Sequence, residues 1–419
     1  MRRHALLLLL PAGLCLVLLA AAAQTPQPPV VPAKHAEPAR PSTGMARDLT
    51  KLTAPQRLCY VSAHQAMDWL RRTNRQDGKF VYGFLPDLRA PLDGDSYTAQ
   101  AGAAYALARA AGYFGDEPSL AISRQALLTL LLETTLDSRD KSIRHMAAPA
   151  HLVNRLGGQG QLVLAIHALP APGKDLLEQA DQLCNYLRKQ QLDNGALLVT
   201  EAGDDPRTAS GEGALECAGI ALQGVLCSQK LQPALWKLEM ARKARAFSHA
   251  CWQQQKSFTL AVRHTPAWAE AYLLTHEQAY ADEVYTMADW LCSLQYDSSD
   301  PVRPTWVGGF RSWVDGRPMQ FAPDIRSAEA AEALGAACRV ARAAGDLPRW
   351  QRYSRALEEG VRFLRTLQYT ENRMQHFVEE YRPALVGGFH ASAQDGKLRI
   401  DYTQHALAAL VGYLEQAME

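Results

Sequence analysis

Apolar residues recur with a helical period along almost the whole chain, in two kinds of segment that alternate. One kind is amphipathic and rich in charged residues, whereas the other is apolar on nearly every face. A helix that is apolar all round has to be surrounded by protein, so we expect an outer and an inner layer of helices. The predicted outer helices are Ala54–Arg75, Ser119–Thr135, Lys174–Gln191, Pro233–Gln254, Glu277–Gln295 and Pro348–Gln368; the predicted inner helices are Tyr97–Tyr113, Gly157–Leu169, Gly211–Cys227, Pro266–Thr275, Ile325–Ala344 and Tyr402–Gln416.

The inner helices start at regular intervals of roughly 55 to 60 residues, with a longer interval before the last, which is the period of a helical hairpin plus its loops. Small side chains, mostly alanine and glycine, let such helices approach one another closely. The alternation predicts an all-α fold, an (α/α)6 toroid of six helical hairpins with inner and outer helix rings. An open α-solenoid is the competing interpretation, and it would expose one face of the inner helices to water.

A short motif at the ends of several outer helices supports the repeat. An aromatic residue and a leucine are followed by a glutamine, which can bind free helix carbonyls, and by a glycine that turns the chain. Its copies are Trp69-Leu70 with Gln76 and Gly78, Tyr186-Leu187 with Gln191 and Gly195, Trp290-Leu291 with Gln295 and Gly308, and Phe363-Leu364 with Gln368 and Gly387. This pattern resembles the repeat of α/α-toroid proteins, seen in terpenoid cyclases and, with looser motifs, in six-hairpin glycosidases. The resemblance spans the body of the chain and implies a fold rather than an activity.

The front of the chain has the composition of an export signal. A basic start, Met1-Arg2-Arg3, precedes an apolar run from Ala5 to Ala23 that closes on small residues. We interpret residues 1–23 as a signal peptide, 24–49 as a linker rich in proline and alanine, and 50–419 as the toroid domain. The protein is then periplasmic or secreted, and an uncleaved N-terminal membrane anchor is the alternative.

Composition narrows the possible partners. The chain has 44 basic and 43 acidic residues, and this balance argues against a nucleic-acid binder that works by bulk charge. No stretch after residue 23 is long and apolar enough for membrane insertion of the mature body. The seven cysteines beyond that point show no CxxC pairing and the histidines no HExxH spacing, so we expect buried thiols, at most one disulfide, no metal and no cofactor.

Candidate chemistry gathers where the inner helices begin. Because each hairpin runs from outer to inner helix, all inner N-termini converge on one end of the ring, which we call the mouth, and most of the longest loops lie there. Carboxylates and aromatic side chains recur at this end, a combination that suits sugars. The candidate catalytic residues are Glu216, Glu270, Asp95, Asp324 and Asp401; the candidate substrate-binding residues are Tyr97, Gln159, Glu212, Trp268, Trp306, Trp313, Arg326, Tyr402 and His405.

Structural roles compete with these assignments. Asp95, Asp324 and Asp401 stand where helix N-caps belong, and Arg326 and His405 can be ion-pair partners of the last two. Tyr97 and Tyr402 can equally be packing residues. Glu216 and Glu270 are different, because each lies in an otherwise apolar segment, where burying a carboxylate without purpose is costly. We therefore expect these two to be an acid/base pair, with an ionised aspartate as partner.

Three functional hypotheses follow. The first is an exported, carbohydrate-active enzyme of the glycoside hydrolase type, with polysaccharide lyase or epimerase chemistry also open. The second is a non-catalytic toroid that binds a glycan or a protein. The third rests on the string Asp93-Gly94-Asp95-Ser96-Tyr97-Thr98-Ala99, which resembles the DxDD-T-A motif of class II terpenoid cyclases. Ser96 replaces the third acid and Tyr97 is an insertion before Thr98, so this match is partial.

Overall fold

The computed structural model describes residues 49–148, 154–199, 211–299 and 301–416, which belong to a unit that runs from Ser42 to Glu419. The predicted signal peptide and all but the last residue of the predicted linker fall outside these ranges. No helix in the described ranges is long and apolar enough to cross a bilayer.

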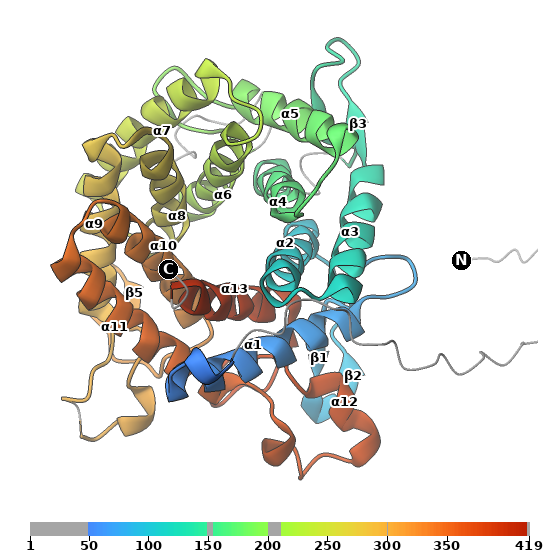
Figure 1. Ribbon diagram of the computed structural model, residues 1–419, viewed down its shortest axis with the longest axis vertical. Coiled ribbons are helices and arrows are strands. Elements are labelled where there is room, and N and C mark those ends of the chain that lie inside the picture. Colours follow the sequence, from blue (N-terminus) through green and yellow to red (C-terminus); the bar gives the residue numbers. More distant parts are fainter. Residues whose placement is uncertain (1–48, 149–153, 200–210, 300, 417–419) are drawn as a thin grey trace, which may run out of the picture. The chain divides into compact units, whose positions relative to one another are not determined.

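Within the described ranges, twelve long helices form two concentric rings, as predicted (Figure 1). Each inner helix packs against the next, and α13 packs against α2, so the inner ring closes and the open solenoid is excluded. The outer helices are α1 (Ala54–Thr73), α3 (Glu117–Leu132), α5 (Lys174–Lys189), α7 (Leu235–Gln254), α9 (Gln278–Leu294) and α11 (Leu347–Leu364). The inner helices are α2 (Tyr97–Phe114), α4 (Arg155–Ala168), α6 (Glu212–Gln229), α8 (Phe258–Thr275), α10 (Ser327–Ala343) and α13 (Ile400–Gln416). The protein is thus an α/α toroid of six hairpins.

The remaining elements lie mostly in the connections that lead from an outer to an inner helix. A three-stranded antiparallel sheet has the order β2-β1-β7, and two hairpins pair β3 with β4 and β5 with β6. The strands are β1 (Gly83–Leu85), β2 (Ala90–Pro91), β3 (Thr134–Leu136), β4 (Arg144–Met146), β5 (Ser312–Val314), β6 (Arg317–Met319) and β7 (Leu398–Arg399). The short helices are α12 (Arg382–Leu385) and the 3-10 turns Leu49–Lys51, Pro86–Leu88, Pro304–Trp306, Arg365–Leu367, Glu371–Arg373 and Glu379–Tyr381.

The repeated glutamine and glycine join neighbouring outer helices. Gln295 Nε2 donates to the carbonyl of Gly308 at 3.0 Å and to that of Ala356, on the next outer helix, at 2.8 Å. Gly308 has φ +90°, and a Cβ there would lie 2.1 Å from the carbonyl oxygen of Glu359, so only glycine fits. Gln191 and Gln368 make the same pair of bonds at their own turns.

In the first copy of this motif, the residue predicted from the sequence was wrong. Asn74, and not Gln76, takes the position of the glutamine, and its Nδ2 donates to the carbonyl of Gly78 at 2.8 Å. Asn74 also pairs with Phe80 in an isolated bridge, as Gln295 does with Phe310. Asn74 stands at the same distance along the chain from Trp69 as each glutamine from its own aromatic residue, so the copies are more regular than the glutamine pattern indicated.

A second correction concerns α8. The sequence predicted its start at Pro266, but the helix begins at Phe258, where the Ser257 side chain accepts a hydrogen bond from the Leu260 amide. Pro266 is therefore an interior residue, tolerated at the loss of one helix hydrogen bond. The residues after it, Trp268 and Glu270, lie in the C-terminal half of the helix and not at the mouth.

The described cysteines are free thiols, four of them buried and three partly buried. Burial raises the pKa of Cys227 and of Cys184 to about 12, which keeps both thiols protonated and unreactive. This agrees with the expectation of buried thiols.

Candidate functional site

A charged network joins four inner helices within the first two turns of each. Arg263, on α8, contacts Glu216 Oε1 of α6 at 2.9 Å and Glu329 Oε1 of α10 at 2.8 Å, both through the same nitrogen, Nη2. Its other terminal nitrogen lies 3.1 Å from Nε2 of His405, on α13. His405 Nδ1 lies 3.0 Å from Glu332 Oε2. We call these five residues the axial network.

The hydrogen bonds define which ring nitrogen of His405 carries the proton. An arginine only donates, so His405 Nε2 has to be the acceptor in its contact with Arg263. The proton of the neutral ring then resides on Nδ1 and is donated to Glu332. Burial raises the pKa of the Glu332 carboxyl, but the bond from His405 and the nearby Arg109 and Arg263 outweigh it and lower that pKa.

Arg263 carries the positive charge of the network. Burial alone would lower its pKa, but Glu329 and Glu216 outweigh burial and raise it. The side chain of Glu216 is 42% exposed, whereas those of Glu329 and Arg263 are 18% and 12% exposed. The network is therefore buried on most sides and reaches solvent through Glu216.

Further polar groups surround the network at the mouth. Asp324, just before α10, is partly buried; burial raises the pKa of its carboxyl and Glu329 adds to the effect, although the Arg326 amide donates to it at 2.9 Å. Glu212 opens α6 and accepts from the Ser257 hydroxyl at 3.1 Å. The side chain of Arg326 is exposed and lies 5.1 Å from the ring of Phe258.

The capping interpretation is wrong for Asp95 and Asp401, whereas Asp324 does accept a backbone amide, that of Arg326, just before α10. Ser96, and not Asp95, caps α2, and Asp95 instead accepts from Gln100 Nε2 at 2.9 Å. Asp401 lies inside α13, and both of its oxygens bind the guanidinium of Arg399. His405 is consequently not the partner of Asp401, because its contacts are to the axial network.

The three tryptophans among the candidate substrate-binding residues lie in different environments. Trp268 has no exposed surface and stacks on Tyr280 between α8 and α9, so it cannot touch a ligand in this structure. Trp313 and Trp306 are partly exposed in the connection that precedes α10. The indole of Trp313 donates to the Lys256 carbonyl at 2.9 Å and therefore borders the start of α8.

The other predicted binding residues have mixed environments. Tyr97 donates its hydroxyl to the Leu130 carbonyl, which is a packing role. Tyr402 is partly exposed and lies under the guanidinium of Arg399, 5.0 Å from the ring centre. Gln159 has no exposed surface, and neither of its amide atoms has a partner among the described residues. Tyr97 and Tyr402 are both partly exposed near the starts of their inner helices, whereas Gln159 is buried.

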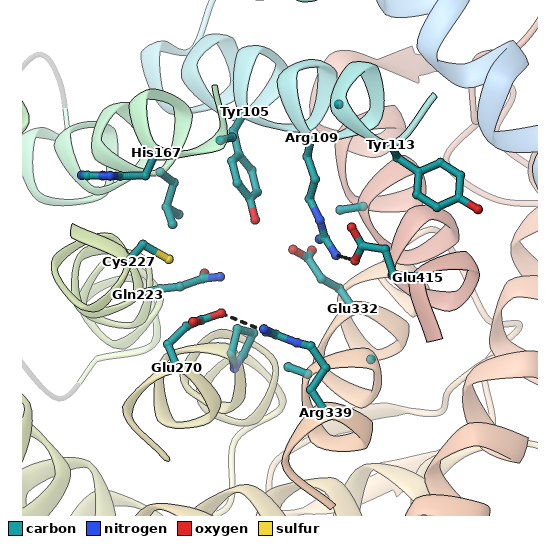
Figure 2. A pocket seen from close by; sticks show the side chains of 18 of the residues that line it. Tyr105, Arg109, Tyr113, His167, Gln223, Cys227, Glu270, Glu332, Arg339 and Glu415 are labelled. Atoms are coloured by element: carbon teal, nitrogen blue, oxygen red, sulfur yellow. Dashed lines mark hydrogen bonds and ion pairs between the residues drawn. The ribbon is translucent and has the colours of Figure 1, made fainter. Parts of the chain in front are cut away.

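A cavity of about 860 Å³ lies at the other end of the ring, lined mainly by the second halves of the inner helices. We call it the C-terminal cavity. Its charged residues are ion-paired: Glu270 Oε1 lies 3.0 Å from Arg339 Nη2, and Arg109 pairs with Glu415 (Figure 2). Glu270 also pairs with Lys230. Burial raises the pKa of Glu270, but the two cations outweigh it and hold that pKa at about 2.

The two expected acid/base glutamates are therefore not brought together. Glu216 belongs to the axial network, and Glu270 belongs to the C-terminal cavity. Glu332 is common to both, because it lines the cavity and binds His405.

Sequence reasoning missed Arg263 and Glu332, and also Arg109 and Arg339 in the cavity. One signal was present, since each is a charged residue inside an otherwise apolar inner helix. Arg263 was hidden by the wrong start of α8. Within the described residues no group of three or more His, Cys, Asp or Glu side chains is arranged to hold a metal ion.

No protein-family model matches the sequence, and no curated protein matches it either. Solved structures do match by shape. An α-1,6-mannanase from Salegentibacter sp. is 12% identical, with a TM-score of 0.59 over 86% of this chain and 99% of that one. A cellobiose 2-epimerase from Bacillus thermoamylovorans is 10% identical, with a TM-score of 0.60 over 86% and 99%. An unsaturated glucuronyl hydrolase from Bacillus sp. GL1 is 13% identical, with a TM-score of 0.57 over 85% and 96%. At these identities the likeness establishes the fold alone, an α/α toroid of six hairpins.

Proposed function

We propose that this protein is a carbohydrate-active enzyme of the glycoside hydrolase type, with its reaction centre at the mouth. The observation that carries the proposal is that one nitrogen of Arg263 holds Glu216 and Glu329 from opposite sides. Their oxygens are separated by no more than the sum of 2.9 and 2.8 Å. Glycosidases act with two carboxyl groups roughly 5 to 10 Å apart, so this spacing is at or below the short end of their range.

The environments of the carboxyl groups suggest a division of roles. A glycosidase needs one protonated carboxyl as acid and one ionised carboxylate as nucleophile or base. Asp324 is the candidate acid beside this pair, because burial raises its pKa and Glu329 raises it further. Glu216 is the candidate ionised group, because Arg263 pairs with it and its side chain is exposed. Trp306, Trp313 and Tyr402 supply accessible aromatic surface for a sugar ring at the same end.

The fold neighbours define the substrates to try first. They include proteins described as an α-1,6-mannanase, an unsaturated glucuronyl hydrolase, a D-mannose isomerase and a cellobiose 2-epimerase. A matching panel consists of α-1,6-mannotriose, an unsaturated glucuronyl disaccharide, mannose and cellobiose. Hydrolysis is measured as new reducing ends for the wild type and for Glu216→Gln, Glu329→Gln and Asp324→Asn.

We expect each of the three variants to lose at least 100-fold in kcat, as is typical when an acid or base is removed. Glu239→Gln is the matched control, because Glu239 is an exposed glutamate on the outer helix α7. Equal hydrolysis by the wild type and all three variants would exclude these residues. No turnover of any glycan by the wild type, combined with saturable binding, would favour the non-catalytic glycan-binding hypothesis.

A second candidate function is sugar isomerisation or epimerisation, in which a base removes a proton next to a carbonyl. The fixed tautomer of His405 favours it, because the Nδ1 proton is anchored on Glu332 and Nε2, once released from Arg263, has a lone pair that can accept a proton. The same panel separates the two reactions. An isomerase converts mannose to a ketose without releasing a new reducing end, and His405→Asn abolishes that conversion.

The cyclase hypothesis has less support. Asp95 is exposed and lies 3.8 Å from the ammonium of Lys79, which is not the environment of an acid that protonates an alkene. Export remains part of the proposal, carried by the composition of residues 1–23. The mass of the protein recovered from the medium or periplasm tests it, because cleavage after Ala23 removes the whole apolar run.

A further inference from the structure

The C-terminal cavity has no role in the reaction proposed above. Its volume of about 860 Å³ lies within the range of roughly 300 to 1,000 Å³ that is typical of small-molecule sites. It opens at the end opposite the mouth. Glu332 and His405 stand between the cavity and Arg263, so the axial network separates the two regions.

The charges of the cavity are balanced. Three cations, Arg109, Lys230 and Arg339, face three carboxylates, Glu270, Glu332 and Glu415. The cations and carboxylates are engaged with one another or, for Glu332, with His405. His167, also in the lining, adds no charge near neutral pH, because burial lowers its pKa to about 4. A charged ligand would need to break one of these pairs, whereas a neutral ligand would not.

Uncharged polar groups point into the space. The side chains of Tyr105 and Gln223 extend toward the centre of the cavity, and the thiol of Cys227 lies beside Gln223 (Figure 2). Neither the Tyr105 hydroxyl nor the Gln223 amide has a hydrogen-bond partner among the described residues. An amide and a phenol each both donate and accept, and the paired guanidinium and carboxylate groups retain unused donors and acceptors around them.

We infer that the C-terminal cavity is a binding site for a neutral polyhydroxyl ligand of the size of a mono- or disaccharide. Hydroxyl groups also both donate and accept, so they match the Gln223 amide, the Tyr105 phenol and the spare positions of the ion pairs. The aromatic face of Tyr105 supplies apolar contact for a sugar ring. This site is distinct from the mouth and carries no catalytic step.

Gly112 offers a variant that closes the cavity without removing a polar group. It lines the cavity within α2, and a Cβ placed there meets no atom within 4 Å. Gly112→Leu projects a side chain into the space, whereas Gly112→Ala changes the volume little and serves as the matched control. Both replacements favour the helix over glycine, so both variants should fold.

Calorimetric titration of the full protein with cellobiose, glucose, glucuronate and glucosamine tests the inference. We expect a neutral sugar to bind the wild type and Gly112→Ala equally, and Gly112→Leu and Gln223→Leu at least tenfold more weakly. Glu216→Gln, at the mouth, should retain this binding event. Circular dichroism and the melting temperature establish that each variant is folded.

Three results would overturn the inference: no neutral sugar binds, glucuronate or glucosamine binds more tightly than glucose, or Gly112→Leu binds as the wild type does. Loss of binding in Glu216→Gln alone would assign the ligand to the mouth and also overturn it. The outcome is independent of the proposed reaction, because hydrolysis is measured separately with the mouth variants.

Discussion

The two ends of the inner ring are built differently. At the end with the C-terminal cavity, connections from inner to outer helix are short; only Gly115 and Asp116 separate α2 from α3, and only His276 and Glu277 separate α8 from α9. At the mouth, the connections from outer to inner helices contain all the described strands. Short turns keep to the rim and leave the axis accessible, whereas long connections can add groups around it.

The arrangement of charged side chains also differs between the two ends. At the mouth one cation, Arg263, is shared by two carboxylates and a histidine. In the cavity the cations and carboxylates are matched in number, with Glu270 between Arg339 and Lys230. A cation shared by several groups can lose one of them to a substrate and still be paired with the others. In a set of matched ion pairs, the loss of one partner leaves a charge unpaired. The difference supports the proposed reaction at the mouth and the proposed binding of a neutral ligand in the cavity.

The largest expected effect comes from Arg263→Met. This change leaves Glu216, Glu329 and His405 without their common partner, and breaking a buried ion pair costs about 3–5 kcal/mol. Arg339→Met should cost less, no more than about 2 kcal/mol, because Arg339 is 33% exposed and Glu270 keeps Lys230. Urea denaturation measures both values. Equal losses would contradict the distinction between a shared cation and a matched set.

A second test compares the stability of the wild type with that of Glu270→Gln as the pH is lowered. The folded pKa of Glu270 is about 2, below its ordinary value of 4.5, so the carboxylate adds stability that is fully present above pH 4.5 and is lost as the pH falls toward 2. A shift of that size corresponds to about 3 kcal/mol at neutral pH. At pH 7 the free energy of unfolding of the wild type should exceed that of Glu270→Gln by this amount, and the two free energies should converge at low pH.

Denaturation curves at several pH values measure this convergence. The exposed Glu239→Gln is the control, and its stability should follow that of the wild type throughout. A gap between the wild type and Glu270→Gln that stays constant down to pH 2 would mean that the ion pairs of the cavity do not hold Glu270 ionised.

The smallest expected effect concerns His167→Gln. Burial lowers the folded pKa of His167 from 6.5 to about 4, so the unfolded chain takes up a proton that the folded protein excludes. Stability is therefore full above pH 6.5 and declines as the pH falls toward 4, by roughly 2 kcal/mol at pH 5. His167→Gln should lack this decline, whereas the exposed His376→Gln should retain it. Thermal unfolding between pH 7 and 5 distinguishes the two, and identical pH slopes would show that His167 is hydrated.

The fold was predictable because its signals are local. Helical periodicity, the alternation of charged and apolar segments and the recurring turn motif predicted both rings and most helix ends to within three residues. The exceptions have local causes as well. Pro266 was interpreted as the start of a helix because proline favours that position, but a buried helix tolerated it in its interior. Gln76 was preferred to Asn74 because the other copies carry glutamine.

The candidate site was predicted less well. Helix order alone determines at which end of the ring a residue lies. For this reason the structure has four of the candidate residues at the mouth, as expected: Glu216, Glu212, Asp324 and Tyr402. Trp268 and Glu270 were misplaced by the single wrong helix start. Arg263 was not considered, although it organises the axial network, since nothing near it in the sequence indicates its partners.

The sequence by itself determined that this chain forms an inner and an outer layer of alternating helices, since the burial of each helix face depends on residues three and four positions apart. Closure of these layers into a ring was established by the contact of α13 with α2. Only the tertiary structure decided which charges meet. Glu216 lies 47 residues before Arg263 and Glu329 lies 66 residues after it, on separate helices. Their contact depends on the closure of the ring and on the rotation of each helix about its own axis. Both are set by the packing of small side chains between helices, and that packing has no signature in a local pattern.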